Sequence, residues 1–167
     1  GGDNAPFSVV EGAVLASRQT QHHICIIGQE ELIIPELKKY KYESEKISVI
    51  NATQVISNDD APVRAVRSKK DSSIVKGINM VKNGEGDIFI SAGSTGALLA
   101  GGLFILGRIQ GIDRPALASV YPIVGGIPSL LVDAGANADC KPNNLLEFGI
   151  MGNIYMEKVI GRKDPKV

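Results

Sequence analysis

Residues 86–108 read GDIFISAGSTGALLAGGLFILGR, and this stretch decides the fold. The short apolar run at residues 88–90 predicts a buried strand, and the alanine- and leucine-rich run at residues 97–106 predicts a helix. A glycine-rich turn, residues 91–96, joins the two. Glycines let a backbone approach a ligand closely, and the free N–H groups of a helix start attract anions. The stretch therefore predicts an anion-binding turn or, as the alternative, a plain strand-to-helix connection of an α/β protein.

The turn supplies two hydroxyl groups, those of Ser94 and Thr95, which suit either an N-cap or a ligand contact. Its glycine spacing differs from the GxGxxG dinucleotide motif, and no lysine follows its second glycine as in a P-loop. Neither NAD nor ATP is therefore predicted. The dipole of a helix start stabilises a bound anion by about 0.3–1 kcal/mol, which contributes to a site without making one alone.

Composition indicates an ordinary globular protein. The chain has 167 residues, of which 44% are hydrophobic and 22% charged, and this predicts a single domain. Eighteen basic and eighteen acidic side chains cancel, so no global charge favours nucleic acid. No apolar stretch reaches the length of a membrane span, and no signal segment opens the chain. A cytoplasmic location is predicted.

The cysteines and histidines offer little catalytic material. Cys25 lies in an apolar run and Cys140 in a polar loop, so they match neither a metal site nor a disulfide scaffold. A nearby cation makes a thiol more reactive, so the adjacent Lys141 leaves Cys140 as an alternative nucleophile. His22 and His23 are the only histidines, so a histidine-based triad and a metal centre are not expected.

Apolar periodicity predicts an alternation of helices and short strands. Helices are expected over residues 6–18, 61–69, 71–82, 97–107 and 142–161, and strands over residues 24–27, 47–50, 88–90, 116–121 and 129–133. Pro35 predicts that residues 30–40 form two short helical pieces, because proline is unfavourable inside a helix.

Short apolar strands separated by helices indicate an α/β fold, with a mostly parallel sheet and helices on both faces. Ligands of such sheets bind outside the carboxyl ends of the strands. This rule selects the loops after Ile90, after Tyr121 and at residues 133–141, and predicts that they lie along one edge.

The loop at residues 133–141 carries a dense set of polar side chains. Asp133 and Asp139 are suited to positioning a hydroxyl group, accepting a proton or binding Mg²⁺, and Lys141 is suited to an anion. The alternative is structural, with Asp133 capping a strand and Asp139 capping the next helix.

Two further clusters are candidates for binding. The densest basic cluster, which suits a phosphate or an acidic protein unless it is merely solvated surface, comprises Arg64, Arg67, Lys69 and Lys70. The segment that opens the chain also places glycines ahead of a helix start, and suits a second ligand-facing loop; it contains Gly1, Gly2 and Asp3. The chain opens on a loop and stops where a further strand is expected, so we expect it to be a piece of a longer protein.

Five blocks of sequence resemble one known family. They are GGDNAP at residues 1–6, AVRSKKDSS at 65–73, SAGSTGALLAGG at 91–102, GRIQGIDRPALAS at 107–119 and LLVDAGANADCKP at 130–142. In this order they are similar to the PlsX-type phosphate acyltransferases of bacterial phospholipid synthesis. The resemblance implies that residues 1–167 are a single α/β domain from the N-terminal half of the enzyme, without the strand that precedes GGD.

The resemblance implies transfer of a long-chain fatty acyl group from acyl carrier protein to inorganic phosphate, without a metal or other cofactor. It also implies a fold like that of phosphate acetyltransferases and isopropylmalate dehydrogenases, a homodimer, and peripheral contact with the inner face of the membrane. The second half of the enzyme is expected to hold part of the cleft, most of the dimer contact and the membrane-touching surface. The alternatives are a phosphate acetyl- or butyryltransferase that uses coenzyme A, and a noncatalytic module that binds a phosphorylated ligand.

Phosphate is itself the nucleophile in such a reaction, so the site needs an anion cradle beside a thioester. Thr95, Lys141 and Asp133 are the predicted catalytic residues. The predicted phosphate- or substrate-binding residues are Gly93, Ser94, Gly96, Asn137, Asp139, Gly1, Gly2 and Asp3. The basic cluster, Arg64 to Lys70, is the predicted docking patch for the acidic carrier protein or for phosphate. Many relatives carry asparagine in place of Ser94 and histidine in place of Asn4, so roles that need those side chains do not carry over.

Overall fold

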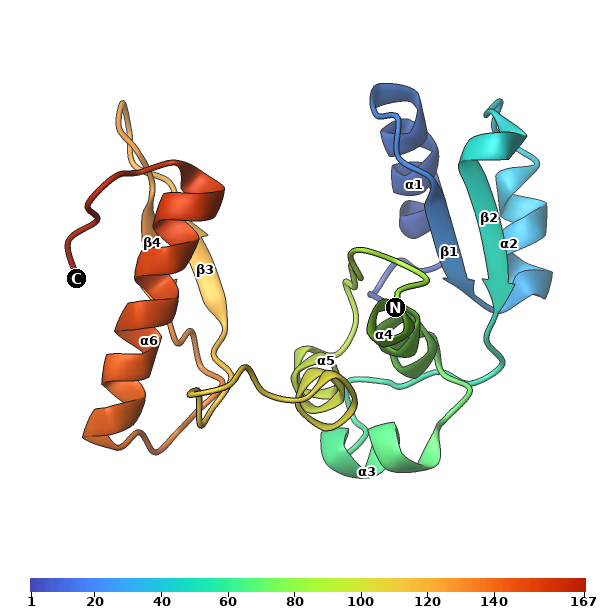
Figure 1. Cartoon of the computed structure of the whole chain (residues 1–167). Helices are drawn as coiled ribbons and strands as arrows, with labels where there is room; N and C mark the ends of the chain where they lie inside the picture. The colour runs from blue at the N-terminus through green and yellow to red at the C-terminus, as the bar shows by residue number, and fades with distance from the viewer. The chain divides into compact units, whose positions relative to one another are not determined.

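The computed structural model describes all residues, 1–167, and the chain forms two compact units, Gly1–Gly107 and Arg108–Val167. Each unit has its own strands and helices (Figure 1). The expectation of a single domain stays a prediction.

The first unit is built on two parallel strands, β1 (Ile24–Gly28) and β2 (Ile47–Asn51), which pair from Ile24 with Ile47 to Gly28 with Asn51. A single 3₁₀ turn, η1 (Ser44–Lys46), leads into β2. Helices α1 (Phe7–Gln19) and α2 (Glu30–Leu37) pack with these strands. The buried cluster between them consists of Val10, Val14, Ile26, Ile33, Leu37 and Ile47. Both predicted strands and the first predicted helix are confirmed.

The prediction that Pro35 divides its helix is wrong, because α2 runs unbroken through this residue. A proline removes the hydrogen bond to the carbonyl of the residue four positions earlier, here Glu31. Both Pro35 and Glu31 are exposed, so water can solvate that carbonyl and the helix tolerates the proline.

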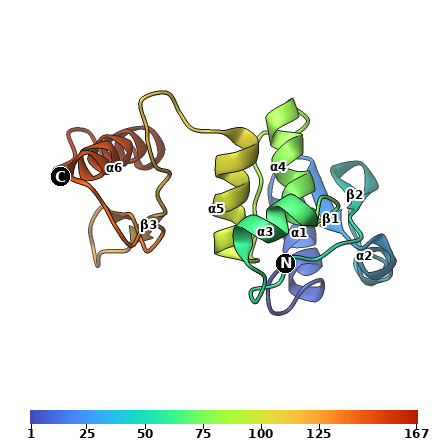
Figure 2. The same cartoon turned by 90° about the horizontal axis from the view of Figure 1, so that it is seen from below.

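Three further helices of the first unit pack around a second cluster. They are α3 (Pro62–Ser68), α4 (Ser73–Asn83) and α5 (Thr95–Gly101), and α5 continues into a π-helical turn, η2 (Gly102–Leu106) (Figure 2). The cluster consists of Ile56, Ala65, Val66, Ile74, Val75, Ile78, Ala97 and Ala100. All three helices were predicted, and α4 ends at Gly84 in the left-handed conformation, with φ of 75°.

The predicted buried strand at residues 88–90 is wrong. The segment has no strand hydrogen bonds, and Ile88 and Ile90 are 79% and 88% exposed. Only Phe89 packs inward, against the second cluster. A strand needs a neighbour for its backbone hydrogen bonds, and in this unit β1 and β2 pair only with each other.

The second unit combines a hairpin with a helix. Strands β3 (Ala118–Tyr121) and β4 (Ser129–Val132) are antiparallel, and α6 (Pro142–Tyr155) continues into a π-helical turn, η3 (Met156–Ile160). The buried side chains of α6 are Asn144, Glu147 and Phe148. Buried Glu147 is satisfied by the backbone N–H of Asp113, at 2.8 Å, and by the side-chain amide of Asn143, at 2.6 Å.

The α/β class is confirmed, but the five-stranded parallel sheet is not. The structure has two two-stranded sheets, one parallel and one antiparallel. The apolar content of β3 and β4 predicts that they are strands but not whether they run parallel or antiparallel. The turn between them contains Gly125, whose positive φ of 70° is typical of the turns that join antiparallel strands in a hairpin. Tyr121 pairs with Ser129 and Ala118 with Val132. The loops after Tyr121 and after Val132 therefore lie at opposite ends of the hairpin, not along one edge. No helix combines the length and the apolar character that a membrane span requires.

Candidate functional site

The first unit has a pocket of about 360 Å³ at the carboxyl ends of β1 and β2. Five stretches of chain line it: the opening loop and α1, the end of β1 with α2, the loop after β2, the start of α4 and the glycine turn. Its polar lining residues include Asp3, Gln29, Gln54, Ser57, Asn58, Ser73 and Ser94. This volume lies within the range of small-molecule sites, which is about 300–1,000 Å³.

Four helices begin at this pocket. The residues preceding α1, α2 and α5, which are Pro6, Gln29 and Ser94, line it, as does Ser73, the first residue of α4. Each helix start carries the positive end of a helix dipole and N–H groups without a partner four residues back in the helix. At α2 the first of these groups is engaged, because the Glu30 N–H donates to Asn51 Oδ1 at 3.1 Å. No lysine or arginine lines the pocket, and Asp3 is its only charged side chain. Backbone N–H groups, hydroxyl groups and the side-chain amides of Gln29, Gln54 and Asn58 are therefore the donors that this pocket offers to an anion.

Glycines hold the opening loop against the glycine turn. A Cβ atom on Gly1 would lie 2.8 Å from the Cα atom of Gly93, which is too close for any side chain. Gly2 has φ of 104°, and a Cβ atom there would lie 3.2 Å from the carbonyl oxygen of Ala92. The two glycine-rich segments, far apart in sequence, thus approach closely because Gly1, Gly2 and Gly93 carry no side chains at the contact.

Ser94 links the turn to its helix. Its Oγ atom accepts a hydrogen bond from the backbone N–H of Ala97, at 3.3 Å, so Ser94 is the N-cap of α5. The hydroxyl hydrogen is not used in that bond and remains able to donate to a ligand. The Gly93 N–H is already engaged, because it donates to Ser91 Oγ at 3.2 Å.

Ion pairing fixes the loop that follows β2 beside the pocket. Lys69 Nζ contacts Asp60 Oδ2 at 2.6 Å and donates to the Val55 carbonyl at 2.8 Å. The same carboxylate accepts from the backbone N–H of Ser57 at 2.8 Å. The hydrogen bond from Lys69, helped by Ser57, lowers the pKa of Asp60.

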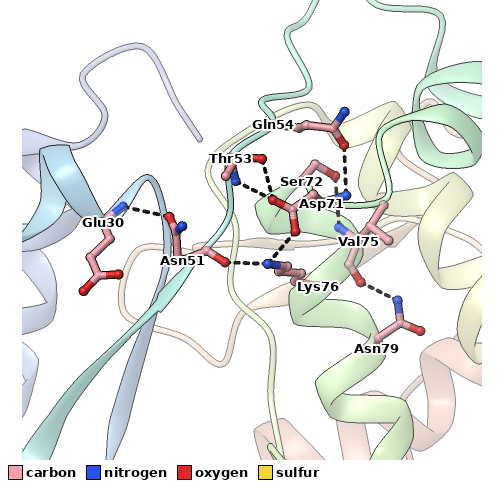
Figure 3. A network of polar contacts seen from close by, with 9 residues as sticks. All are labelled: Glu30, Asn51, Thr53, Gln54, Asp71, Ser72, Val75, Lys76 and Asn79. Atoms are coloured by element: carbon pink, nitrogen blue, oxygen red, sulfur yellow. Dashed lines mark hydrogen bonds and ion pairs between the residues drawn. The ribbon is translucent and has the colours of Figure 1, made fainter.

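A second network joins the end of β2 to the start of α4 (Figure 3). The Asp71 carboxylate accepts from the Thr53 backbone N–H at 2.7 Å and from the Thr53 hydroxyl at 2.6 Å, and it pairs with Lys76. The Asp71 N–H donates to Gln54 Oε1 at 2.9 Å. Lys76 also donates to the carbonyl of Asn51, the last residue of β2. This network positions Gln54 and the first turn of α4 at the pocket.

The same contacts change the acidity of Asp71. The hydrogen bond from Lys76 and the bonds from Thr53 hold the pKa of its carboxyl well below its usual value, outweighing a small desolvation effect. Asp71 is therefore a charged structural anchor at neutral pH.

The basic cluster separates into residues with different contacts. Lys69 is held by Asp60, as above, and Lys70 donates to the Val66 carbonyl at 3.3 Å. Arg67 lies over the ring of Phe104, 5.1 Å from its centroid. Arg64 and Arg67 are both exposed on α3. The two arginines are the members of the cluster whose charge faces solvent from a helix.

In the second unit, Asp133 organises its own loop. Its carboxylate accepts from the backbone N–H groups of Leu117, Ala136 and Asn137, at 3.2, 3.1 and 2.9 Å, and from the Asn137 side chain at 3.1 Å. Partial burial alone would raise the pKa of Asp133, but these four hydrogen bonds outweigh it and lower the pKa. The predicted catalytic role of Asp133 stays a prediction.

The remaining predicted residues are placed as follows. Gly1, Gly2, Asp3, Gly93 and Ser94 line the pocket of the first unit. Thr95 and Gly96 begin α5 outside the lining, and a Cβ atom on Gly96 would lie 2.8 Å from Pro62 Cγ, so the missing side chain lets α5 approach α3 closely. Asp139 and Lys141 are exposed in the second unit. The structure corrects the alternative that Asp139 caps α6, because the N-cap is Lys141.

Sequence interpretation missed four polar residues of the pocket, namely Gln29, Gln54, Ser57 and Asn58. All four follow the carboxyl ends of β1 and β2. The rule that ligands bind at the carboxyl ends of strands also points to these residues, but we applied it only to the loops after Ile90, after Tyr121 and at residues 133–141.

The chain contains no group of three or more His, Cys, Asp and Glu side chains that could hold a metal ion. Cys25 is half-buried, with its Sγ atom 3.2 Å from Ser48 Oγ, and Cys140 is exposed. The expectation that no metal or cofactor is needed stays a prediction.

Comparison with known proteins gives a consistent result. Residues 1–167 match the family described as "Fatty acid synthesis protein". The chain is 60% identical to a phosphate acyltransferase of Alkaliphilus oremlandii (strain OhILAs) and 54% identical to one of Clostridioides difficile (strain 630). These matches cover 100% of this chain and 50% and 49% of the relatives, so the chain spans about half the length of the curated relatives it matches. The chain therefore belongs to the fatty acid synthesis protein family, the PlsX-type family that its five sequence blocks resemble.

Proposed function

We propose that this chain forms the phosphate-binding part of an enzyme that moves a long-chain fatty acyl group from acyl carrier protein to inorganic phosphate. The observation that carries the proposal is the convergence of four helix starts on one pocket that holds no basic side chain. A site built from N–H and hydroxyl donors binds an anion without an ion pair, because the donors are fixed before the ligand arrives.

The proposed chemistry balances without a further reactant. A phosphate oxygen attacks the thioester carbonyl, and a new C–O bond forms. The tetrahedral intermediate then collapses, the C–S bond breaks, and the sulfur leaves with the electron pair. The products are acyl phosphate and the carrier thiolate, which takes up a proton from phosphate or water. Within this scheme the Ser94 hydroxyl and the helix starts orient phosphate and stabilise developing negative charge.

Two further parts of the proposal concern the second unit and the partners. We assign Asn137, Asp139, Lys141 and Asp133 to the substrate cleft of the complete enzyme, and Thr95 and Gly96 to the phosphate end of it. Arg64 and Arg67 suit the acidic carrier protein because both are exposed on one helix. A homodimer, peripheral membrane contact and a cytoplasmic location belong to the same proposal.

The test is phosphate-dependent consumption of palmitoyl-acyl carrier protein by the chain in its full-length context. We expect acyl phosphate and free carrier to form in equal amounts. Gly2→Ala should lower kcat/KM for phosphate by about tenfold, because a side chain at this positive φ strains the loop by roughly 1–3 kcal/mol. Gly12→Ala is the matched control, since a Cβ atom at Gly12 in α1 meets no atom within 4 Å.

Three outcomes would contradict the proposal. Equal activity with acyl-coenzyme A and no preference for the carrier protein would favour the acetyl- or butyryltransferase alternative. Phosphate binding without turnover would favour a noncatalytic module. Unchanged phosphate kinetics in Gly2→Ala would remove the opening loop from the phosphate site.

A further inference from the structure

The pocket at the strand ends has an apolar wall as well as polar donors. Val9 on α1, Leu32 on α2 and Val55 in the loop after β2 all line it. Their side chains are 39%, 49% and 56% exposed. Three large apolar side chains from three elements thus meet water at one pocket.

The apolar wall continues into the core. Val10, Ile26 and Ile33 also line the pocket, and each is buried in the cluster between the strands and α1 and α2. The wall therefore rests on packed side chains and keeps its shape without a ligand.

The same pocket offers two kinds of chemistry to one ligand. Its helix starts and hydroxyl groups suit an anionic or oxyanionic centre, and the apolar wall suits a hydrocarbon. A free phosphate ion uses only the first. A ligand that joins a phosphate or thioester group to an aliphatic chain uses both.

We infer that Val9, Leu32 and Val55 hold methylene groups of the acyl chain, and that Leu32 takes part in selecting chain length. This inference rests on the proposed function, because it takes the ligand to be an acyl group. Each methylene group removed from water contributes about 0.8 kcal/mol, which corresponds to about a fourfold gain in affinity.

The decisive variant is Leu32→Trp, which replaces one side chain of the apolar wall with a larger ring and so narrows the pocket. Its matched control is Leu15→Trp, because Leu15 is a helix residue that is 48% exposed, against 49% for Leu32, and does not line the pocket. Both positions are half-exposed, so both variants should fold, as a thermal unfolding curve will check.

The first measurement is affinity for butyl, hexyl and octyl phosphate by titration calorimetry, which needs no turnover. In the unmodified protein we expect affinity to rise by about two- to fourfold per methylene group. In Leu32→Trp the gain in binding free energy per methylene group should fall to less than half of its value in the unmodified protein, whereas in Leu15→Trp this gain should be unchanged. Equal slopes in all three proteins, or no dependence on chain length, would overturn the inference.

The second measurement is kcat/KM with octanoyl- and palmitoyl-acyl carrier protein in the full-length context. Leu32→Trp should lower the preference for the longer chain by about tenfold or more, whereas Leu15→Trp should keep the preference of the unmodified protein. The same preference in both variants would overturn the inference and leave the proposed function standing. If alkyl phosphates bound with an affinity that depends on chain length but the enzyme showed no turnover, the proposed function would be overturned, whereas binding of an aliphatic chain by the apolar wall would be supported.

Discussion

At the scale of single residues, the pocket depends on side chains that never touch its interior. Asp71 does not line the pocket, yet it binds both Thr53 and Lys76. Lys69 likewise holds Asp60 and the Val55 carbonyl. These contacts set the path of the chain between β2 and α4, where six lining residues lie: Ala52, Gln54, Val55, Ile56, Ser57 and Asn58. The positions of the ligand-facing donors therefore follow from charged anchors behind them.

Asp71 gives a pH-dependent prediction. Its pKa in the folded protein is lowered from 3.8, so its ionised form stabilises the fold at pH values above 3.8, and this contribution is lost as the pH falls toward the folded pKa. Asp71→Asn should therefore be less stable than the unmodified protein at pH 7, and the difference should shrink as the pH is lowered below about 4. Urea unfolding at a series of pH values measures the free energy of unfolding of both proteins.

A suitable control is Asp87→Asn, since Asp87 has no part in this network. The prediction would be contradicted if Asp71→Asn and the unmodified protein differed in free energy of unfolding by the same amount from pH 7 to pH 3. Such a result would show that the charge of Asp71 does not stabilise the contact between the end of β2 and the start of α4.

Local residue chemistry was predictable where it acts within a few residues of sequence. The sequence predicted a helix from residue 71, and Ser72 caps α4 by accepting from the Val75 N–H at 3.4 Å. It predicted Ser94 or Thr95 as the next cap, and the structure selects Ser94. The contacts of Asp71 with Thr53 and of Lys69 with Asp60 were not predictable, because each joins residues that only the folded chain brings together.

At the scale of elements, the segment at residues 86–94 shows why an apolar run is an ambiguous signal. Phe89 packs inward while its two isoleucine neighbours face solvent. Apolar composition alone does not distinguish a strand buried on both faces from an extended segment anchored by one aromatic ring. The strand direction of β3 and β4 is hidden from the sequence for a similar reason, because pairing partners are chosen in three dimensions.

The anchor of this segment predicts a large effect at Gly77 in α4. The Phe89 ring occupies the place that a Cβ atom on Gly77 would take. Gly77→Ala should therefore destabilise the protein by about 1–3 kcal/mol through overpacking, despite the roughly 0.5–1 kcal/mol that alanine gains over glycine within a helix. Denaturant unfolding measures the change.

Gly12→Ala in α1 is the matched comparison, because nothing lies within 4 Å of the added carbon, and it should be neutral or stabilising. Truncation of the ring in Phe89→Ala should remove most of the additional effect of Gly77→Ala, giving a non-additive double mutant. Additive effects of the two substitutions would contradict the proposed clash between Gly77 and Phe89.

At the scale of the whole molecule, stability is unevenly distributed. Both hydrophobic clusters consist of residues of the first unit, whereas the buried apolar residues of the second unit are Phe148 and Met156. The two networks around Asp71 and Lys69 also lie wholly within the first unit. The α/β class followed from the alternation of elements along the sequence, but this division did not, because it depends on which helices share a core.

The distribution of the core predicts that residues 1–107 fold alone. A polypeptide of this length encloses both clusters and the complete lining of the pocket, so it should unfold cooperatively in urea and still bind octyl phosphate. Residues 108–167, prepared in the same way, should unfold without a cooperative transition, because small chains with little buried apolar surface are marginal. Circular dichroism and titration calorimetry test both polypeptides. Loss of the cooperative transition in residues 1–107 would contradict this prediction, since the first unit would then need the second to complete its core.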